Sequence, residues 1–205
     1  MEATPWVNSQ SGRRKQVVAF VFTIKEELSF DYGPKANFKK KKLKLGCFNG
    51  LPAFCKTLVE RMQRTEQLRD FVPVELCDLE YVPDRGSAID PHFDDFWLWG
   101  ERLVTLNLLS DTYLTLSKDD QPGVEVLVPM PRKSLIIVSG PARFQWKHAI
   151  KRDHIQSRRI AMTFRELAPE FLEGGPQEDT GRKMIDLAKT FRGVAVGGQL
   201  SLIQS

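Results

Sequence analysis

The sequence AIDPHFDDFWLWGERLV at residues 88–104 places a histidine and two carboxylates directly before a run of aromatic side chains. On an extended segment, residues i and i+2 point to the same side of the chain. His92 and Asp94 can therefore share one metal ion, whereas the side chain of Asp95 points away. The alternative interpretation is a polar turn before a buried strand, which needs no metal. In the same way, the aromatic residues Phe96, Trp97 and Trp99 fit either a core or a surface that stacks a base.

A metal site needs a second histidine, and the chain has only three. His148 lies in the alternating segment RFQWKHAI, where it shares a face with Trp146 and Ile150. His154 lies in a charged turn and is the poorer candidate. The competing explanation for His148 is a hydrogen-bonded core histidine between apolar neighbours.

The segment RIAMTFR, residues 159–165, alternates strictly and is typical of a strand. Arg159 and Arg165 fall on one face, with Ala161 and Thr163 between them. A buried guanidinium needs a partner, so this face is either exposed to solvent or forms the floor of a pocket. In a pocket, one arginine grips a carboxylate and the small Ala161 leaves room for it.

Two histidines, one carboxylate and a downstream arginine together point to one kind of chemistry. A facial arrangement of two imidazoles and one carboxylate leaves three positions open on an ion, which suits Fe(II) in an oxygenase. A 2-oxo acid such as 2-oxoglutarate then takes two positions and O2 takes the third. The far carboxylate of the 2-oxo acid needs a fixed cation, which an arginine on a neighbouring strand supplies.

The rest of the chain is predicted to be mainly β, with a helix at residues 51–68 whose buried face carries Phe54, Leu58, Met62 and Thr65. Short strands separated by Gly, Pro and Asp favour a sandwich or barrel over a βαβ sheet. A second short helix is predicted at residues 183–191, within an otherwise poorly ordered end. The predicted strands are residues 74–82, 102–109, 124–130, 133–140, 143–150 and 158–167.

Composition allows a packed core and excludes several other classes. Of the 205 residues, 41% are hydrophobic and 27% are charged, with a net charge of +4 that permits an acidic partner. The three cysteines form no CxxC pair, which argues against a disulfide framework and a structural zinc site. We expect a reducing compartment, the cytoplasm and the nucleus. The longest apolar run, residues 17–24, is too short to span a membrane.

The pattern of an HxD motif, a distant histidine and two arginines separated by five residues resembles the AlkB family of iron and 2-oxoglutarate dioxygenases. The segments DYGPKANF, RGSAIDPHFDDFWLWGERLV, QWKHAI and AMTFREL carry the same resemblance, which covers most of residues 1–170. It implies a double-stranded β-helix, or jelly roll, with a flanking helix. It also implies residues 1–50 as a lid that faces the substrate, residues 51–170 as the catalytic core and residues 171–205 as a flexible tail.

The resemblance also implies a set of site residues, each at a position that matches the family motif. The expected iron ligands are His92, Asp94 and His148, and the expected 2-oxoglutarate contacts are Arg159, Arg165 and Tyr81. Arg159 matches the arginine that holds the distal carboxylate, and Tyr81 matches a tyrosine that hydrogen-bonds the same co-substrate.

Three features depart from the family pattern. Leu79 stands where many relatives have an asparagine that contacts 2-oxoglutarate. Phe96 stands where some nucleobase-repair members carry an acidic residue near the base, which argues against base recognition of their type. Residues 17–30 interrupt the expected lid and are interpreted as an insertion.

The implied reaction is oxidative removal of an N-methyl group, with release of formaldehyde, succinate and CO2. The leading substrate is monomethyl-lysine of actin, and the next is N6-methyladenine in DNA. The basic run KKKKLK at residues 39–44 is either a solvated loop or a patch that contacts phosphates. The alternative function is a non-catalytic module that binds actin and myosin because its lid is altered.

Overall fold

The computed structural model describes residues 20–21, 31–46 and 48–195. They fall into two compact units built from interleaved pieces of the chain. The first unit consists of Met1–Glu27, Leu79–Asp94 and Glu101–Thr163, and the second of Leu28–Asp78, Asp95–Gly100 and Phe164–Ser205. The predicted division at residues 50 and 170 stays a prediction. No described helix is long and apolar enough to cross a membrane.

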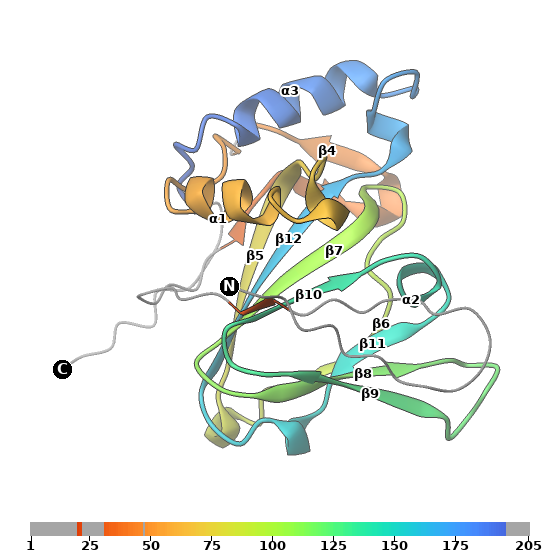
Figure 1. The fold of residues 1–205 in the computed structure, drawn as a ribbon. Helices are drawn as coiled ribbons and strands as arrows, with labels where there is room; N and C mark the ends of the chain where they lie inside the picture. The colour runs from red at the N-terminus through yellow and green to blue at the C-terminus, as the bar shows by residue number, and fades with distance from the viewer. Residues whose placement is uncertain (1–19, 22–30, 47, 196–205) are drawn as a thin grey trace. The chain divides into compact units, whose positions relative to one another are not determined.

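A four-stranded antiparallel sheet belongs wholly to the first unit (Figure 1). Its strand order is β6-β11-β8-β9. The strands are β6 (Ile89–His92), β11 (Lys147–Ile150), β8 (Thr112–Ser117) and β9 (Glu125–Met130).

A six-stranded sheet has the order β1-β10-β7-β12-β5-β2. Its strands are β1 (Phe20–Val21), β10 (Ser134–Val138), β7 (Trp99–Leu108), β12 (Arg159–Leu167), β5 (Pro73–Tyr81) and β2 (Asp31–Tyr32). From β5 to β12 the chain passes back and forth between the two sheets, with eight strands in all, which is the jelly-roll arrangement. The predicted double-stranded β-helix is confirmed.

The long strands are buried more completely than simple alternation predicts. All five residues of β10 are buried, and in β7 both Val104 and its neighbour Leu103 are buried. Consecutive buried residues mean that these parts of the strands have no side that faces solvent. Asn107 is fully buried, whereas Leu109, the residue directly after β7, is 40% exposed and adopts a positive φ of 70°.

The predicted strand at residues 143–150 is correct only in its second half. Gly140 has a φ of 58° and Pro141 follows it, so the chain turns into the short helix α2 (Pro141–Phe144). Proline is favoured at the first position of a helix because its missing N–H needs no partner there. The strand β11 begins at Lys147, in time to carry His148.

The helices of the second unit differ from their predicted bounds. α1 (Cys55–Met62) is shorter than the predicted helix at 51–68, and a separate 3₁₀ turn covers Glu66–Leu68. Leu58 and Met62 are buried as predicted, but Phe54 precedes the helix and is 41% exposed. The remaining turns of 3₁₀ helix are Phe38–Lys40, Pro83–Arg85, Arg152–His154 and Pro169–Phe171.

The segment after residue 171 is more regular than its composition indicates. α3 (Glu178–Ala188) replaces the predicted helix at 183–191 and ends three residues earlier. Its residues Met184 and Ala188 are buried within the second unit, so this part of the chain is packed. A small hairpin of β3 (Lys35–Asn37) and β4 (Lys42–Lys44) belongs to the same unit.

The insertion predicted at residues 17–30 lies outside the described residues except for Phe20–Val21. These two residues form β1, which pairs antiparallel with β10 at the edge of the six-stranded sheet.

Candidate metal centre

His92 and His148 are direct partners in the antiparallel pairing of β6 with β11. Residues that face each other across such a pair project their side chains to the same side of the sheet. The two imidazole rings accordingly lie with their centroids 4.3 Å apart and their planes inclined by 53°. The register of one strand pair therefore brings together two histidines that are distant in sequence.

Asp94 completes a group of three possible metal ligands, as the HxD spacing predicts. Its Oδ1 lies 3.8 Å from Nε2 of His92, and the ligand atoms of Asp94, His92 and His148 all lie within 4.8 Å of one another. A separation of 3.8 Å is too long for a hydrogen bond but suits two atoms that bind a common ion.

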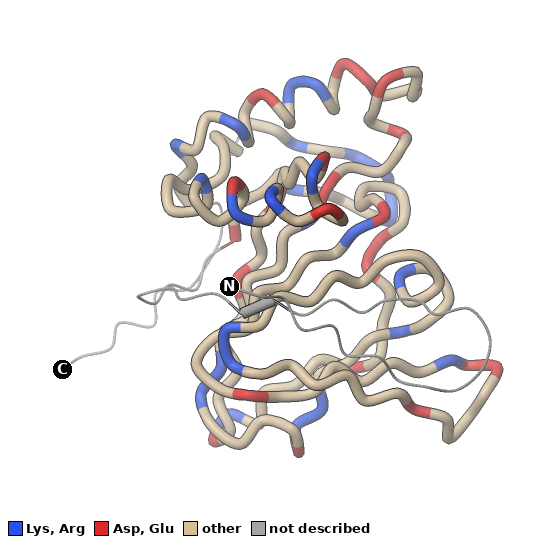
Figure 2. The backbone as a smooth tube through the Cα atoms, viewed as in Figure 1, with Lys and Arg blue, Asp and Glu red and all other residues tan. Residues whose placement is uncertain are grey.

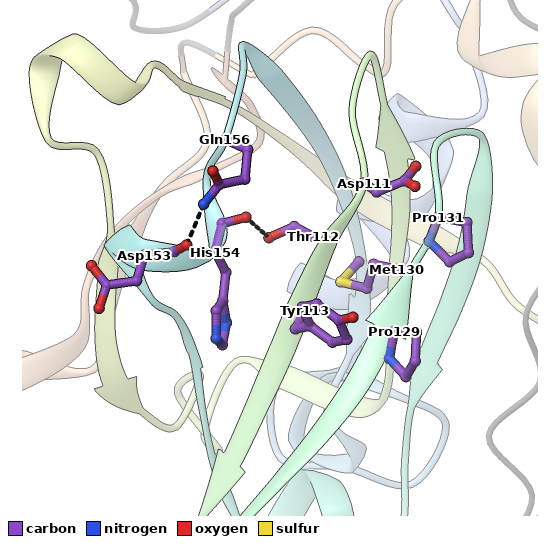
Figure 3. A pocket seen from close by; sticks show the side chains of 9 residues that line it. All are labelled: Asp111, Thr112, Tyr113, Pro129, Met130, Pro131, Asp153, His154 and Gln156. Atoms are coloured by element: carbon purple, nitrogen blue, oxygen red, sulfur yellow. Dashed lines mark hydrogen bonds between the residues drawn. The ribbon is translucent and has the colours of Figure 1, made fainter.

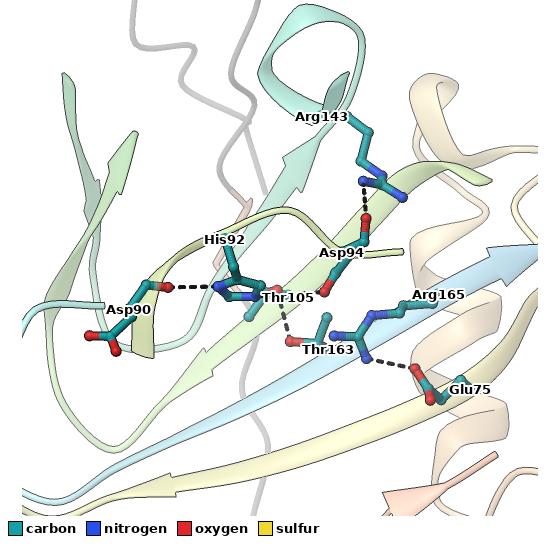
Figure 4. A network of polar contacts seen from close by, with 8 residues as sticks. All are labelled: Glu75, Asp90, His92, Asp94, Thr105, Arg143, Thr163 and Arg165. Atoms are coloured by element: carbon teal, nitrogen blue, oxygen red, sulfur yellow. Dashed lines mark hydrogen bonds and ion pairs between the residues drawn. The ribbon is translucent and has the colours of Figure 1, made fainter. Parts of the chain in front are cut away.

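The hydrogen bonding of His92 leaves its metal-facing nitrogen free of a proton. Nδ1 lies 2.8 Å from the carbonyl oxygen of Asp90, as Figure 4 shows. A carbonyl oxygen only accepts hydrogen bonds, so Nδ1 must donate and the neutral ring carries its lone pair on Nε2. This is the arrangement that orients metal-binding histidines in proteins.

Asp94 and Asp95 have different surroundings, and only the first suits a ligand. Asp94 is 9% exposed, and its backbone carbonyl accepts a 3.0 Å hydrogen bond from the buried guanidinium of Arg143 (Figure 4). The carboxylate of Asp95 instead accepts hydrogen bonds from the backbone N–H groups of Trp97 and Leu98, each at 2.9 Å. Asp95 therefore caps the following turn.

The donor set of the triad fits an oxygenase iron better than a structural metal. Two imidazoles and one carboxylate match the ligands of non-haem Fe(II) oxygenases. A structural zinc site has four protein ligands and is rich in thiolates, whereas this group has three and contains no cysteine. None of the three residues is fully enclosed by the protein.

Arg159 is buried at the start of β12 and has unsatisfied hydrogen-bonding capacity. The residue is 1% exposed, its Nε donates to Oδ1 of Asn107 at 2.5 Å, and its guanidinium lies 4.6 Å from the ring centre of Tyr81. Burial lowers the pKa of the guanidinium, while Tyr81 acts in the opposite direction. The terminal nitrogen NH1 is buried with no hydrogen-bond partner.

A buried N–H group without an acceptor costs free energy, and a carboxylate is the acceptor that a guanidinium binds best. The face of β12 that carries Arg159 and Ala161 is buried, which rules out the solvent-exposed alternative for these two residues. The surroundings of Arg159 thus fit the distal carboxylate of a 2-oxo dicarboxylic acid.

Arg165 belongs to the second unit and already has a partner in the protein. Its NH1 lies 2.6 Å from a carboxylate oxygen of Glu75 on β5, and its guanidinium lies 5.8 Å from the ring centre of Trp99. Its expected contact with 2-oxoglutarate stays a prediction. Tyr81, in contrast, is buried in the same unit as Arg159 and the triad.

Two buried polar residues of the first unit are not marked by any sequence motif. Asn107 interrupts the apolar strand β7 and contacts Arg159, and an isolated polar residue in such a strand is the one signal that could have found it. Arg143 is 2% exposed and holds the backbone of Asp94, but its short helix gives no warning of this contact.

His154 lies apart from the triad, as its charged surroundings predict. It lines a separate hollow of about 260 Å³ in the first unit (Figure 3). Its ring is 5.3 Å from that of Tyr113, and its backbone oxygen accepts from Thr112 at 3.0 Å. The other lining residues are Asp111, Pro129, Met130, Pro131, Asp153 and Gln156.

The aromatic residues that follow Asp95 and the basic run at residues 39–44 belong to the second unit. Trp97 is buried and packs edge-on against Phe171 at 5.4 Å, so it belongs to the core, whereas Phe96 is 47% exposed. The lysines of residues 39–44 are exposed on the β3–β4 hairpin and its turn. Lys and Arg residues are spread over both units and interspersed with Asp and Glu (Figure 2).

Comparison with known proteins gives close relatives over almost the whole chain. A protein of Mus musculus named alpha-ketoglutarate-dependent dioxygenase alkB homolog 4 is 45% identical over 223 residues, which cover 94% of this chain and 69% of the relative. A protein of Caenorhabditis elegans named DNA N6-methyl adenine demethylase is 40% identical over 190 residues, which cover 91% of this chain and 60% of that relative.

No model of a protein family matches the chain. Among solved structures, one described as the structure of OsALKBH1 aligns with a TM-score of 0.46 and 12% identity, covering 73% of this chain and 77% of that chain.

Proposed function

Because this chain belongs to the AlkB family of alpha-ketoglutarate-dependent dioxygenases, we propose that it removes N-methyl groups oxidatively at a site built from His92, Asp94 and His148. The cofactor is Fe(II), and the co-substrates are 2-oxoglutarate, which is the same compound as alpha-ketoglutarate, and O2. The observation that carries the proposal is the pairing of His92 with His148 across two strands, with Asp94 beside them.

His92 and Asp94 have definite tasks in this proposal. The Nδ1–H of His92 donates a hydrogen bond to the carbonyl oxygen of Asp90, so Nε2 is the nitrogen that can bind the ion. Asp94 supplies the negative charge that favours a divalent cation, and Arg143 fixes its backbone. Bound Fe(II), with 2-oxoglutarate and O2, supplies oxidation of a methyl C–H bond, and the products are succinate, CO2, formaldehyde and the free amine.

Arg159 and Tyr81 are proposed to hold the co-substrate by its distal carboxylate. The buried and unpartnered NH1 of Arg159 supports this role, because a carboxylate would supply its missing acceptor. Arg165 is proposed as the second arginine of the motif, with its guanidinium held by Glu75. These contacts orient the co-substrate and do not take part in bond breaking.

We propose two candidate substrates. The resemblance of the sequence favours monomethyl-lysine of actin, and the name of the nematode relative favours N6-methyladenine in DNA. The exposed lysines of the β3–β4 hairpin support the second candidate, because phosphate contacts dominate affinity for DNA. The cytoplasm and the nucleus are proposed here as locations.

The test is a single-substrate assay of the purified chain with Fe(II), 2-oxoglutarate and O2. One arm uses actin that carries monomethyl-lysine, and the other uses duplex DNA that contains N6-methyladenine. We expect one arm to release formaldehyde and succinate in equal amounts, and the His148→Ala variant to release neither. Stable hydroxylation without formaldehyde would contradict demethylation, and capture of actin without any turnover would support the binding module instead.

A further inference from the structure

Asn107 occupies an unusual place for an amide, in the apolar segment at the end of β7. The residue is fully buried in the first unit, between Leu106 and Leu108, which are also buried. A polar side chain in such a strand costs free energy unless its hydrogen bonds are satisfied. Its four possible bonds must therefore be accounted for.

The orientation of the Asn107 amide is fixed by its neighbours. Its Nδ2 lies within hydrogen-bond distance of three backbone carbonyl oxygens, those of Ser110 at 2.9 Å, Met130 at 2.7 Å and Pro131 at 3.0 Å, so its two hydrogens are shared among them. Carbonyl oxygens only accept, so the NH2 group must point toward them and a flipped amide would meet repulsion. The other end of the side chain, Oδ1, is thereby aimed at Arg159.

The Oδ1 atom of Asn107 occupies one donor of the Arg159 guanidinium. Nε donates to it at 2.5 Å, and the ring of Tyr81 lies 4.6 Å from the guanidinium carbon. These two contacts fix the plane of the group, and the buried NH1 is left without a partner. The amide is neutral, so it orients the arginine without cancelling its positive charge.

We propose that Asn107 is a positioning residue that sets the Arg159 guanidinium to bind the distal carboxylate of 2-oxoglutarate through NH1. This inference rests on the proposed function and adds a residue to the binding of its co-substrate. A neutral acceptor at Nε keeps the charge of Arg159 available for the ligand. A carboxylate at residue 107 would form an ion pair with the arginine and compete with the co-substrate.

The competing explanation is that Asn107 only ties together the turns at residues 108–110 and 130–133. A matched control exists for that role, because Asp111 also joins these turns but is not the acceptor of the Arg159 hydrogen bond. Its Oδ1 accepts a 2.6 Å hydrogen bond from the backbone N–H of Arg132. Asp111→Ala therefore disturbs the same two turns without removing the acceptor of Nε.

The experiment is calorimetric titration of the Mn(II)-loaded chain, which does not turn over, with two ligands. One ligand is 2-oxoglutarate, and the other is 2-oxovalerate, which keeps the keto and C1-carboxylate groups but ends in a methyl group. Asn107→Ala should lower the affinity for 2-oxoglutarate by about tenfold, which is the effect of one charge-assisted hydrogen bond. It should change the affinity for 2-oxovalerate by less than about twofold. Asn107→Asp, which keeps the side-chain shape, should lower the affinity for 2-oxoglutarate at least as much.

Two further measurements decide between positioning and a general structural role. In an Arg159→Ala background, Asn107→Ala should have no additional effect on 2-oxoglutarate, because coupled residues are not additive. Asp111→Ala should bind both ligands as the parent chain does. Equal weakening of both ligands, or a full effect of Asn107→Ala without Arg159, overturns the positioning role. Absence of 2-oxoglutarate binding by the parent chain overturns the proposed function itself.

Discussion

His92 and His148 face each other across β6 and β11, with their ring centroids 4.3 Å apart. The register of this strand pair determines the site, because a slip of one residue would move one imidazole to the opposite face of the sheet. The register shifts immediately after this pair, between His148 and Ile150, so the irregularity lies next to the ligands. Irregular pairing next to a functional site is common in β proteins.

The two adjacent carboxylates should separate metal binding from stability. Asp94→Ala should reduce Fe(II) affinity by at least about 100-fold, because it removes the only carboxylate of the triad. Asp95→Ala should retain the metal and lose roughly 1 kcal/mol of unfolding free energy, since its carboxylate caps the N–H groups of Trp97 and Leu98. Metal titration and chemical denaturation of both variants measure the two effects, and the reverse pattern would overturn the ligand assignment.

Two neighbouring arginines provide a matched test of co-substrate binding. Arg159→Ala should lower the affinity for 2-oxoglutarate by roughly 10- to 100-fold and leave the affinity for Fe(II) unchanged. Arg158→Ala removes a half-buried guanidinium that pairs with Glu80 at 2.7 Å, and it should change neither affinity by more than about twofold. Titration of each variant with 2-oxoglutarate checks this, and equal losses would remove Arg159 from the proposed site.

The ion pairs of Glu80 should give the fold a dependence on acid pH. The hydrogen bond from Arg158, and then that from Arg85, hold the pKa of Glu80 below its usual value, although burial opposes them. The stabilisation is therefore present above the ordinary pKa of a glutamate and is lost as the pH falls through the lowered value.

Glu80→Gln should accordingly have a lower Tm than the parent chain at neutral pH, and the gap should close as the pH falls below the ordinary pKa of a glutamate and through the lowered pKa of Glu80. Thermal unfolding across this range measures the gap. Arg158→Ala should reduce the dependence more than Arg85→Ala, because the Arg158 hydrogen bond has the larger effect on this pKa. A gap that stays constant with pH would show that the ion pairs are not its cause.

Gly100 should not tolerate a side chain, because β7 runs close to the end of β12. A Cβ atom there would lie 2.5 Å from the carbonyl oxygen of Leu167, which is backbone and cannot move aside. Gly100→Ala should therefore cost about 1–3 kcal/mol of unfolding free energy. Gly46→Ala is the control, since its Cβ would meet no atom within 4 Å. Equal stability of the two variants in denaturant titration would contradict the packing at Gly100.

Periodicity and spacing were sufficient to predict the parts of the fold and site that depend on local pattern. The strict alternation of residues 159–165 predicts β12 and places Arg159 beside Ala161 on one face. The i, i+2 spacing predicts that His92 and Asp94 share a side, as the 3.8 Å separation confirms. The pairing of His92 with His148 could not be read in this way, because cross-strand register depends on the whole sheet.

Other parts of the molecule depend on long-range packing and were not predictable. Arg143 donates a hydrogen bond to the backbone of Asp94 from a short helix, and Asn107 on β7 contacts Arg159 on the neighbouring strand β12. The predicted helix at 51–68 is too long because α1 ends at Met62 and the chain then turns. Helix bounds of this kind are set by tertiary contacts rather than by residue propensity alone.

The most direct test of the metal site is anaerobic addition of Fe(II) and 2-oxoglutarate to the purified chain, with the visible absorption of the iron–2-oxoglutarate chelate as the readout. We predict a weak charge-transfer band in the parent chain that disappears in His148→Ala and weakens in Arg159→Ala. A folded parent chain that gives no band, or a band that survives in His148→Ala, would contradict an iron site built from His92, Asp94 and His148.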